Sequence, residues 1–314
     1  MGRYIALRIL QAIPVVLGTT LLIYFLVFAM PGDPIAAMFG DKQPPAGVVQ
    51  QIRDNYHLND PFIVQYFYFL KGVFTLDLGN AFNGRPIAEL IGAALPVTAV
   101  LAGLAFVFEI LIGVTCGIVA GIKRRSIFDN TVLIISLVLI SIPTFVMGYV
   151  LQFVLGVQLK ILPTTVGSNV DLLHMLMPAL VLAGVSIAYI FRLTRGEMAQ
   201  TLLADHVRTA RAKGLTAKQV TLRHVFRNSL MPLVTYVGTD LAALMGGALV
   251  TETVFNIHGI GYLMYTNIHK GDGTVVVSVV AILVLAYVVS NIIVDCLYAL
   301  LDPRIRVGKK VSSG

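Results

Sequence analysis

Three acidic side chains lie within or near long apolar stretches of this sequence, where an ionisable group is costly unless it has a partner or faces water. Glu109 interrupts the stretch that begins near Val97, and Asp240 interrupts the one that begins near Leu230. Two interpretations of Glu109 stay open: a residue of a polar pathway or its gate, and a protonated carboxyl group hydrogen-bonded inside a helix bundle. The same two apply to Asp240. Glu252 lies near the end of its stretch, where we expect water to be within reach.

A block of basic residues from Arg208 to Pro232 is the second feature with chemical potential, since it carries six Arg or Lys and no Asp or Glu. The stretch "AQTLLADHVRTARAKG" favours a helix that stops at Gly214, a residue suited to a helix end. The motif "TAKQ" at 216–219 matches a capping box and starts a second helix towards Pro232. The sequence therefore predicts two helices that meet at a turn around Gly214.

This basic block has two interpretations. A basic loop beside apolar segments is most often only a determinant of membrane topology. The helix, turn and helix layout favours a docking element as the rival. Small residues at Ala210, Ala212 and Gly214 keep the backbone close to the surface, so that a groove on a partner protein can receive the turn. Arg211 and Lys213 are available to pair with acidic groups on that partner.

The chain that holds these residues has the composition of a membrane protein. Of its 314 residues, 57% are hydrophobic and 12% are charged, and the mean hydropathy is +0.85, which excludes a soluble globular protein. A span of the bilayer takes about 20 apolar residues. Six runs are long enough, and they begin near Ile9, Val97, Val132, Leu173, Leu230 and Val275. The first exceeds the core of a signal peptide and lacks a clear cleavage site, so we expect it to be retained.

The distribution of basic residues indicates the orientation of these spans. With the N-terminus in the cytoplasm, 17 of the 23 Lys and Arg residues lie on the cytoplasmic side. Both termini are therefore predicted to be cytoplasmic, and the basic block falls in a cytoplasmic loop between the fourth and fifth spans. A sizeable segment, roughly 31–95, lies outside, where its Tyr, Phe and Leu content predicts short helices at the outer mouth.

Motifs for catalysis or cofactor binding are absent from the sequence. No G-x-x-x-x-G-K-[ST] motif occurs, so ATP hydrolysis, if it drives this protein, is expected on another subunit. Neither H-E-x-x-H nor G-x-S-x-G occurs, and the six histidines lack the spacing of metal ligands. Cys116 and Cys296 lie inside apolar runs and are interpreted as small buried hydrophobes. We expect no catalytic residue, cofactor or metal in this chain, and no nucleic-acid partner.

The residues "RTARAKGL" at 208–215 resemble the cytoplasmic coupling segment of permease subunits in ATP-binding-cassette importers, as the peptide and nickel branch writes it. Further stretches resemble the same branch: "PGDP" at 31–34, "YHLNDPFIVQYFYFL" at 56–70, "LTRGEM" at 193–198, "GGALVTETVFNIHGIG" at 246–261 and "LYALLDPRIR" at 297–306. The chain is most similar to oligopeptide permeases of the "B" type. It departs from the family pattern at His258, where the family usually has Pro, and at Leu76, where it often has Gly.

The resemblance implies an all-α integral membrane protein with six transmembrane helices and the type I importer permease fold. Residues 1–94 would hold the first transmembrane helix and an extracytoplasmic helical segment. Residues 95–302 would form a core permease domain of five transmembrane helices, with cytoplasmic coupling helices at about 198–230, and 303–314 a cytoplasmic tail. The implied location is the cytoplasmic (inner) cell membrane, crossed several times.

The resemblance also implies partners. They are a second homologous permease subunit in a heterodimer, two cytoplasmic ATP-binding subunits that carry ATP and Mg, an extracytoplasmic substrate-binding protein, a peptide substrate and membrane lipid. The residues implied in coupling to the ATPases are Arg208, Thr209, Ala210, Arg211, Ala212, Lys213, Gly214 and Leu215. The candidates for the pathway or its gates are Glu109, Asp240, Glu252 and Phe255, with Glu252 in an outer-gate motif.

Other functions stay open as alternatives. Within the same family, the substrate could be nickel or another small solute. From different classes, an intramembrane enzyme needs a nucleophile or metal set converging at one depth, and no recognised motif for one is present. A passive channel is the third hypothesis, and it would function without partner ATPases.

Overall fold

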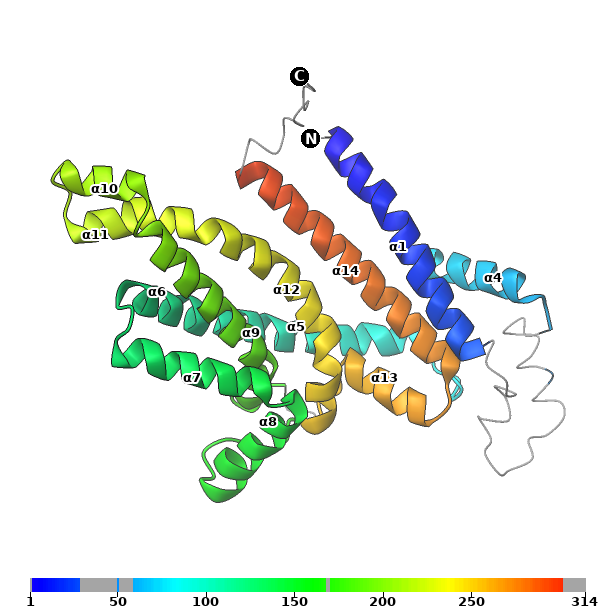
Figure 1. Ribbon diagram of the computed structural model, residues 1–314. Coiled ribbons are helices and arrows are strands. Elements are labelled where there is room, and N and C mark those ends of the chain that lie inside the picture. Colours follow the sequence, from blue (N-terminus) through cyan, green and yellow to red (C-terminus); the bar gives the residue numbers. More distant parts are fainter. Residues whose placement is uncertain (1, 29–49, 51–58, 168–169, 302–314) are drawn as a thin grey trace. The chain divides into compact units, whose positions relative to one another are not determined.

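The computed structural model describes residues 2–28, 50, 59–167 and 170–301 (Figure 1). Within these ranges the regular secondary structure is helical, and the only β pairing consists of two isolated bridges. The helices are α1 Gly2–Phe28, α4 Phe62–Thr75, α5 Ile87–Phe108, η1 Glu109–Val114, α6 Thr115–Ile122, α7 Ile127–Ser141, α8 Thr144–Leu151, η2 Gln152–Gln158, α9 Leu172–Thr201, α10 Asp205–Ala212, α11 Ala217–Val220, η3 Thr221–Phe226, α12 Arg227–Val254, α13 Ile260–His269 and α14 Gly273–Leu301. The η segments are π-helical.

Several sequence predictions fall outside the described residues. The "PGDP" motif at 31–34 and the tail at 303–314 lie there, as does most of 29–58 in the segment expected at the outer mouth. The part of that segment that is described forms α4 and the start of α5, which agrees with the expectation of short helices for its second half.

Among the described residues, the helices are long and apolar enough for up to six spans if each bent pair of helices is counted as one span. Four are continuous, at Ala6–Phe28, Ile87–Ile122, Leu172–Thr201 and Gly273–Val294. The second begins at Ile87 and not near Val97, because Pro96 is accommodated inside α5. The pair Ile127–Ser141 and Thr144–Gln158 bends by 109°. The cause is Pro143, since a residue before Pro is disfavoured in a helix, and Ile142 is extended with φ −92° and ψ 125°.

The chain divides into two compact units. Residues 1–97 and 258–314 form unit 1, and residues 98–257 form unit 2, so that α5 continues from one unit into the other. In unit 1, α1 and α14 run antiparallel (Figure 1). They approach closely, because a Cβ on Gly273 would lie 2.5 Å from Val27. Tyr66 of α4 donates a hydrogen bond to the Leu17 carbonyl of α1 at 3.0 Å, which holds α4 against α1.

The end of α4 explains one departure from the family pattern. Leu76 caps this helix in the left-handed conformation, with φ 59° and ψ 19°. Glycine adopts that conformation without steric cost, whereas a residue with a Cβ destabilises the fold by about 1 kcal/mol there. The backbone at Leu76 therefore has the conformation that favours Gly, the residue that the resemblance leads us to expect there.

Unit 2 is built around α9, which packs against η1, α6, α7, α8 and α12. Three glycines at four-residue intervals, Gly113, Gly117 and Gly121, line the face of η1 and α6 that meets α9. A Cβ on Gly117 would lie 2.6 Å from the Thr194 side chain, and one on Gly121 would lie 2.6 Å from Met198. Small residues at this spacing let two helices pack backbone to backbone in a membrane. The glycine stripe thus fixes α6 against α9.

Candidate functional site

The basic block forms a helix, a turn and a second helix, as the sequence predicts. α10 ends at Ala212, and a second helical stretch starts at Ala217 and continues through η3 into α12. One detail differs: the sequence favoured a single helix through "AQTLLADHVRTARAKG", but α9 stops at Thr201 and α10 begins at Asp205. Ala204 between them is extended, with ψ 150°. The change of direction buries one side of α10, and that packing outweighs the helix propensity of the connecting residues.

The turn after α10 has the hydrogen bonds of a Schellman motif. Gly214 takes φ 80°, and its N–H donates to the Arg211 carbonyl at 3.0 Å. The N–H of Leu215 donates to the Ala210 carbonyl at 3.4 Å, and both residues belong to one hydrophobic cluster. The predicted helix end at Gly214 is therefore confirmed, and glycine is suited to it because the backbone is left-handed there.

The capping box at the start of the second helix is also confirmed. The backbone N–H of Thr216 donates to Oε1 of Gln219 at 3.0 Å, and the N–H of Gln219 donates to Oγ1 of Thr216 at 3.4 Å. These two bonds satisfy backbone donors that would otherwise have no partner at a helix start. The two helices are thus joined by a turn whose backbone is held from both sides.

A hydrophobic cluster attaches this α10–α11 turn, residues 205–220, to the rest of unit 2. Its buried members come from α9, α10, α11 and η3, and they are Met198, Val207, Ala210, Val220 and Val225. Of the eight residues implied in coupling, Ala210 is only 5% exposed and therefore supports the turn from inside. Leu215 is half-buried. The exposed residues are Arg208, Thr209, Arg211, Ala212, Lys213 and Gly214.

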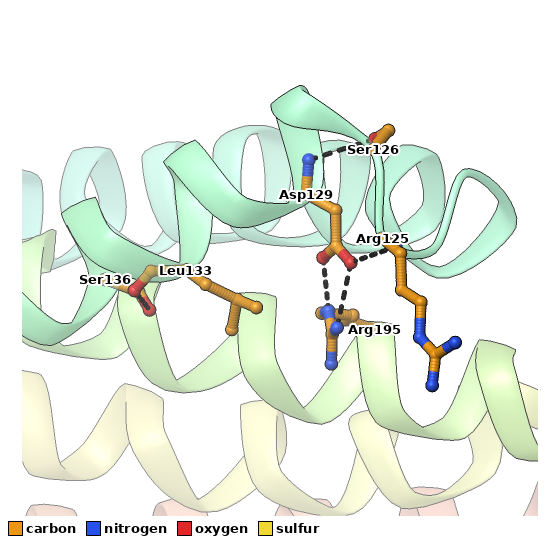
Figure 2. A network of polar contacts seen from close by, with 6 residues as sticks. All are labelled: Arg125, Ser126, Asp129, Leu133, Ser136 and Arg195. Atoms are coloured by element: carbon orange, nitrogen blue, oxygen red, sulfur yellow. Dashed lines mark hydrogen bonds and ion pairs between the residues drawn. The ribbon is translucent and has the colours of Figure 1, made fainter.

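Figure 2 shows an ion pair between Asp129 and Arg195 that the sequence alone did not indicate. Asp129, near the start of α7, is fully buried and receives two hydrogen bonds from the guanidinium of Arg195 on α9. The backbone N–H of Arg125 donates to the same carboxylate at 2.8 Å. Asp129 also takes part in the helix start, because its N–H donates to Ser126. Since Gly121 packs on Met198 and on the Arg195 backbone, α6, α7 and α9 are joined at one point.

The two intramembrane acids are brought together in the middle of unit 2. Glu109 is the first residue of η1 and is fully buried, and neither of its oxygens has a hydrogen-bond donor among the described residues. The Asp240 carboxyl on α12 is close enough to interact with it. Tyr236, one turn earlier on α12, interacts with both Asp240 and Ser186 of α9. The sequence placed these acids on separate spans without indicating that they meet.

Polar and aromatic side chains next to this cluster are exposed on α9 and α12. Tyr189 of α9 stacks on Tyr236 with ring centroids 4.4 Å apart and is 51% exposed. Arg192 of α9 and Thr239 of α12 are also exposed, and Asp240 is half-exposed. A lipid-facing helix surface is normally apolar, so polar groups in these positions indicate a face that meets water or another protein.

Glu252 lies in the last turn of α12 and Phe255 caps the end of that helix, about 40 Å along the helix from its start. Against the expectation of nearby water, Glu252 is fully buried, and Oγ1 of Thr98 donates a hydrogen bond to it at 2.5 Å. Phe255 is also buried, and its carbonyl accepts a bond from the Val166 N–H at 3.0 Å. The Gln152 amide ties this end further by donating to the carbonyl of Val254 at 3.0 Å. Tertiary packing closes over a position that is near a span end in sequence.

Comparison with known families accounts for this architecture. The model of the "Binding-protein-dependent transport system inner membrane component" family matches residues 113–307, and the model of its N-terminal region matches residues 1–102. The chain belongs to this family. It is therefore a multi-pass membrane component of a binding-protein-dependent transport system, as the apolar spans also indicate.

Curated relatives in this family cover nearly the whole chain. The oligopeptide transport system permease protein OppB of Salmonella typhimurium is 34% identical over 308 residues, which are 98% of this chain and 100% of that protein. AppB of Bacillus subtilis, also called an oligopeptide transport system permease protein, is 35% identical over 315 residues, 97% of this chain and 99% of that protein. A probable peptide ABC transporter permease protein of Sinorhizobium fredii, y4tP, is 33% identical over 98% of this chain.

Among solved structures, a chain of the MetNI methionine ABC transporter, from an inward-facing crystal form, is similar with a TM-score of 0.57. Its sequence identity is 19%, and the match covers 68% of this chain and 97% of that one. This likeness shows the shared fold. The predicted type I importer permease fold is thus confirmed for the family member described here.

Proposed function

We propose that this chain is the transmembrane permease subunit of an ATP-driven importer and forms half of the translocation path for peptides delivered by an extracytoplasmic substrate-binding protein. Relatives that cover nearly the whole chain are named oligopeptide or peptide permeases, which supports a peptide substrate. A nickel or other small-solute importer of the same family is the alternative cargo, and uptake measurements discriminate the two.

The single observation that carries this proposal is the construction of the α10–α11 turn. Its inner side is anchored by a buried cluster, and its backbone is held by the Schellman motif and the capping box. Its outer side exposes small residues and the cations Arg208, Arg211 and Lys213. A rigid, basic knob of this kind suits a groove with acidic groups on a cytoplasmic ATP-binding subunit.

The junction beneath the turn can carry its movement to the spans. Met198 joins the turn's cluster to α9, and Gly121 packs on the same residue from α6. The Asp129–Arg195 pair adds α7 to this junction. Because packed helices shift as rigid elements, a displacement of the turn by closing ATPases would reach α6, α7 and α9 together, in an alternating-access cycle.

The remaining expectations complete the proposed assembly. We infer a heterodimer with a second homologous permease, and two cytoplasmic ATPase subunits that bind ATP and Mg, so that this chain carries no catalytic residue. Within the described residues no group of three or more His, Cys, Asp or Glu is placed to hold a metal. The excess of Lys and Arg on one side supports cytoplasmic termini in the inner cell membrane.

Replacing Gly214 with Phe in the complete importer tests the coupling role. Phe at φ 80° strains the turn and enlarges its outer surface, and no atom of this chain lies within 4 Å of a Cβ built there. We expect more than about tenfold loss of ATP-driven uptake in proteoliposomes, with the amount of membrane-inserted protein unchanged. Gly84→Phe is the matched control, because Gly84 has φ 79° and the same open space but lies in unit 1.

Three outcomes would contradict the proposal. Normal uptake by the Gly214→Phe importer would remove the turn from coupling. Equal loss in the Gly84→Phe importer would indicate a general folding defect. Uptake by this chain reconstituted without ATPases would favour a passive channel.

A further inference from the structure

Glu109 is buried without a hydrogen bond from a backbone or basic donor among the described residues. It is 0% exposed, both of its carboxyl oxygens lack a donor among the described residues, and the group that reaches it is a second acid, Asp240. One oxygen of Asp240, Oδ2, is buried without a hydrogen bond as well. Two carboxyl groups that meet in an apolar bundle repel each other unless one of them is protonated or a cation lies beside them. With one of the two protonated, the pair still carries one negative charge, which a positively charged group beside it can balance.

The backbone at Glu109 also departs from the regular helix. The π-helical segment η1 starts at this residue, inside a span that is α-helical before and after it. Such single-turn π segments displace side chains from the regular helical positions and are frequent at functional sites. Gly113, at the end of the same turn, packs against Ile190 of α9 and fixes η1 in place.

The surroundings fit an organic ammonium group better than a metal ion. The described residues offer no third His, Cys, Asp or Glu at this place, so a divalent metal would lack ligands. The Tyr236 hydroxyl interacts with Asp240, and the stacked rings of Tyr236 and Tyr189 lie next to it. Carboxylates, a hydroxyl and an aromatic face are the groups that bind a primary ammonium.

The site is also accessible from one face of unit 2. Asp240 is half-exposed, and Thr239 and Tyr189 beside it are exposed. Asp240 lies 13 residues into α12, roughly 20 Å from the start of that helix, and so near the middle of the span. A cargo that moves along this face would pass the carboxyl pair halfway across the membrane.

We propose that Asp240 and Glu109, with the Tyr236 hydroxyl, bind the primary ammonium group of the cargo during translocation. This inference rests on the proposed function, because it requires a cargo that moves through the chain. Asp240 makes the direct contact with its negative charge, and Glu109 behind it is a neutral acid that holds Asp240 in position. The site would favour cargo with a free amino group over the same cargo without one.

The test compares two cargoes in proteoliposomes that hold the complete importer. One is a tripeptide with a free amino terminus, and the other is its N-acetylated form. We expect Asp240→Asn to raise the KM for the free-amine peptide about tenfold, the effect of losing one charge-assisted contact, and Glu109→Gln, which leaves the charge on Asp240, to raise it less. The KM for the acetylated peptide should stay within about twofold. For each peptide, the KM of the variant is compared with the KM of wild type, so that any preference of the binding protein affects both values equally. Glu89→Gln is the control for an exposed carboxyl outside the site.

A second measurement covers an importer whose binding protein rejects acetylated peptides. Ethylammonium chloride, compared with sodium chloride at equal ionic strength, should inhibit free-amine peptide uptake by the wild type and not by Asp240→Asn. Asp240→Glu, which keeps the charge, should retain most of the inhibition.

The proposal fails if the variants change uptake of both peptides equally or if ethylammonium inhibits wild type and Asp240→Asn alike. It also fails if the variants only shift the pH profile by the same amount for both peptides, since the pair would then bind protons and not the cargo. A wild-type importer that takes up neither peptide would contradict the proposed function itself.

Discussion

Asp129 and Glu109 are both fully buried carboxyl groups of unit 2, and both lie on helices that pack against α9. Three N–H groups donate to the Asp129 carboxylate, two from the Arg195 guanidinium and one from the Arg125 backbone. Glu109 has no donor among the described residues and meets another acid. Burial therefore has opposite meanings at the two positions.

This difference distinguishes a buried ion pair with a structural role from a buried acid whose hydrogen bonds are incomplete within the described residues. A buried charge whose hydrogen bonds are complete inside the chain fixes the geometry of the elements that it joins. A buried acid without such bonds destabilises the chain by itself, and a fold retains such a group chiefly at functional sites. Asp129 binds Arg195, three residues before Met198 of the cluster that supports the α10–α11 turn, whereas Glu109 lies buried behind Asp240.

Removing Asp129 should produce the largest effect on stability. Asp129→Ala leaves the Arg195 charge without its partner, and we expect a loss of about 3 kcal/mol in the free energy of unfolding. The readout is thermal unfolding of the purified complex. The double variant Asp129→Leu with Arg195→Met removes both charges and should recover much of the loss. If the single variant unfolds like wild type, the pair is not a structural clamp.

Replacing a glycine of the stripe that lies between Glu109 and Asp129 in the sequence should have an intermediate effect on stability. A Cβ on Gly117 would lie 2.6 Å from Thr194, so Gly117→Ala should cost about 2 kcal/mol by forcing α6 away from α9. Gly103→Ala is the matched control, because a Cβ there meets no atom within 4 Å. Equal stability of the two variants in the same unfolding assay would show that close α6–α9 packing is not required.

Replacing Glu109 with Gln should have the smallest effect on stability. Glu109→Gln removes a buried acid without removing a hydrogen bond from a donor, so the free energy of unfolding should change by less than about 1 kcal/mol or increase. The comparison sharpens if Asp129→Asn, the same kind of substitution, destabilises clearly more. A large loss in Glu109→Gln would indicate that this carboxyl is a structural group after all.

Local signals in the sequence predicted the α10–α11 turn well. The Gly214 helix end and the Thr216–Gln219 capping box both appear in the structure, because each depends on a few neighbouring residues. The bend at Pro143 likewise depends only on neighbouring residues. The break between α9 and α10 was not predicted, because it depends on burying Val207 against residues that are distant in sequence.

The sequence by itself determined that this chain is a multi-span membrane protein with a basic helix, turn and helix between two spans, since hydropathy, charge and caps are local properties. Only the tertiary structure decided which buried charges are paired. Asp129 meets Arg195 across 66 positions, and Glu109 meets Asp240 from a different span. Such contacts depend on how closely two helices approach. Here glycines on η1 and α6 set the distance between those helices and α9. Neither the glycine spacing nor the acids alone specify the partner helix, because that is chosen by the packing of the whole unit.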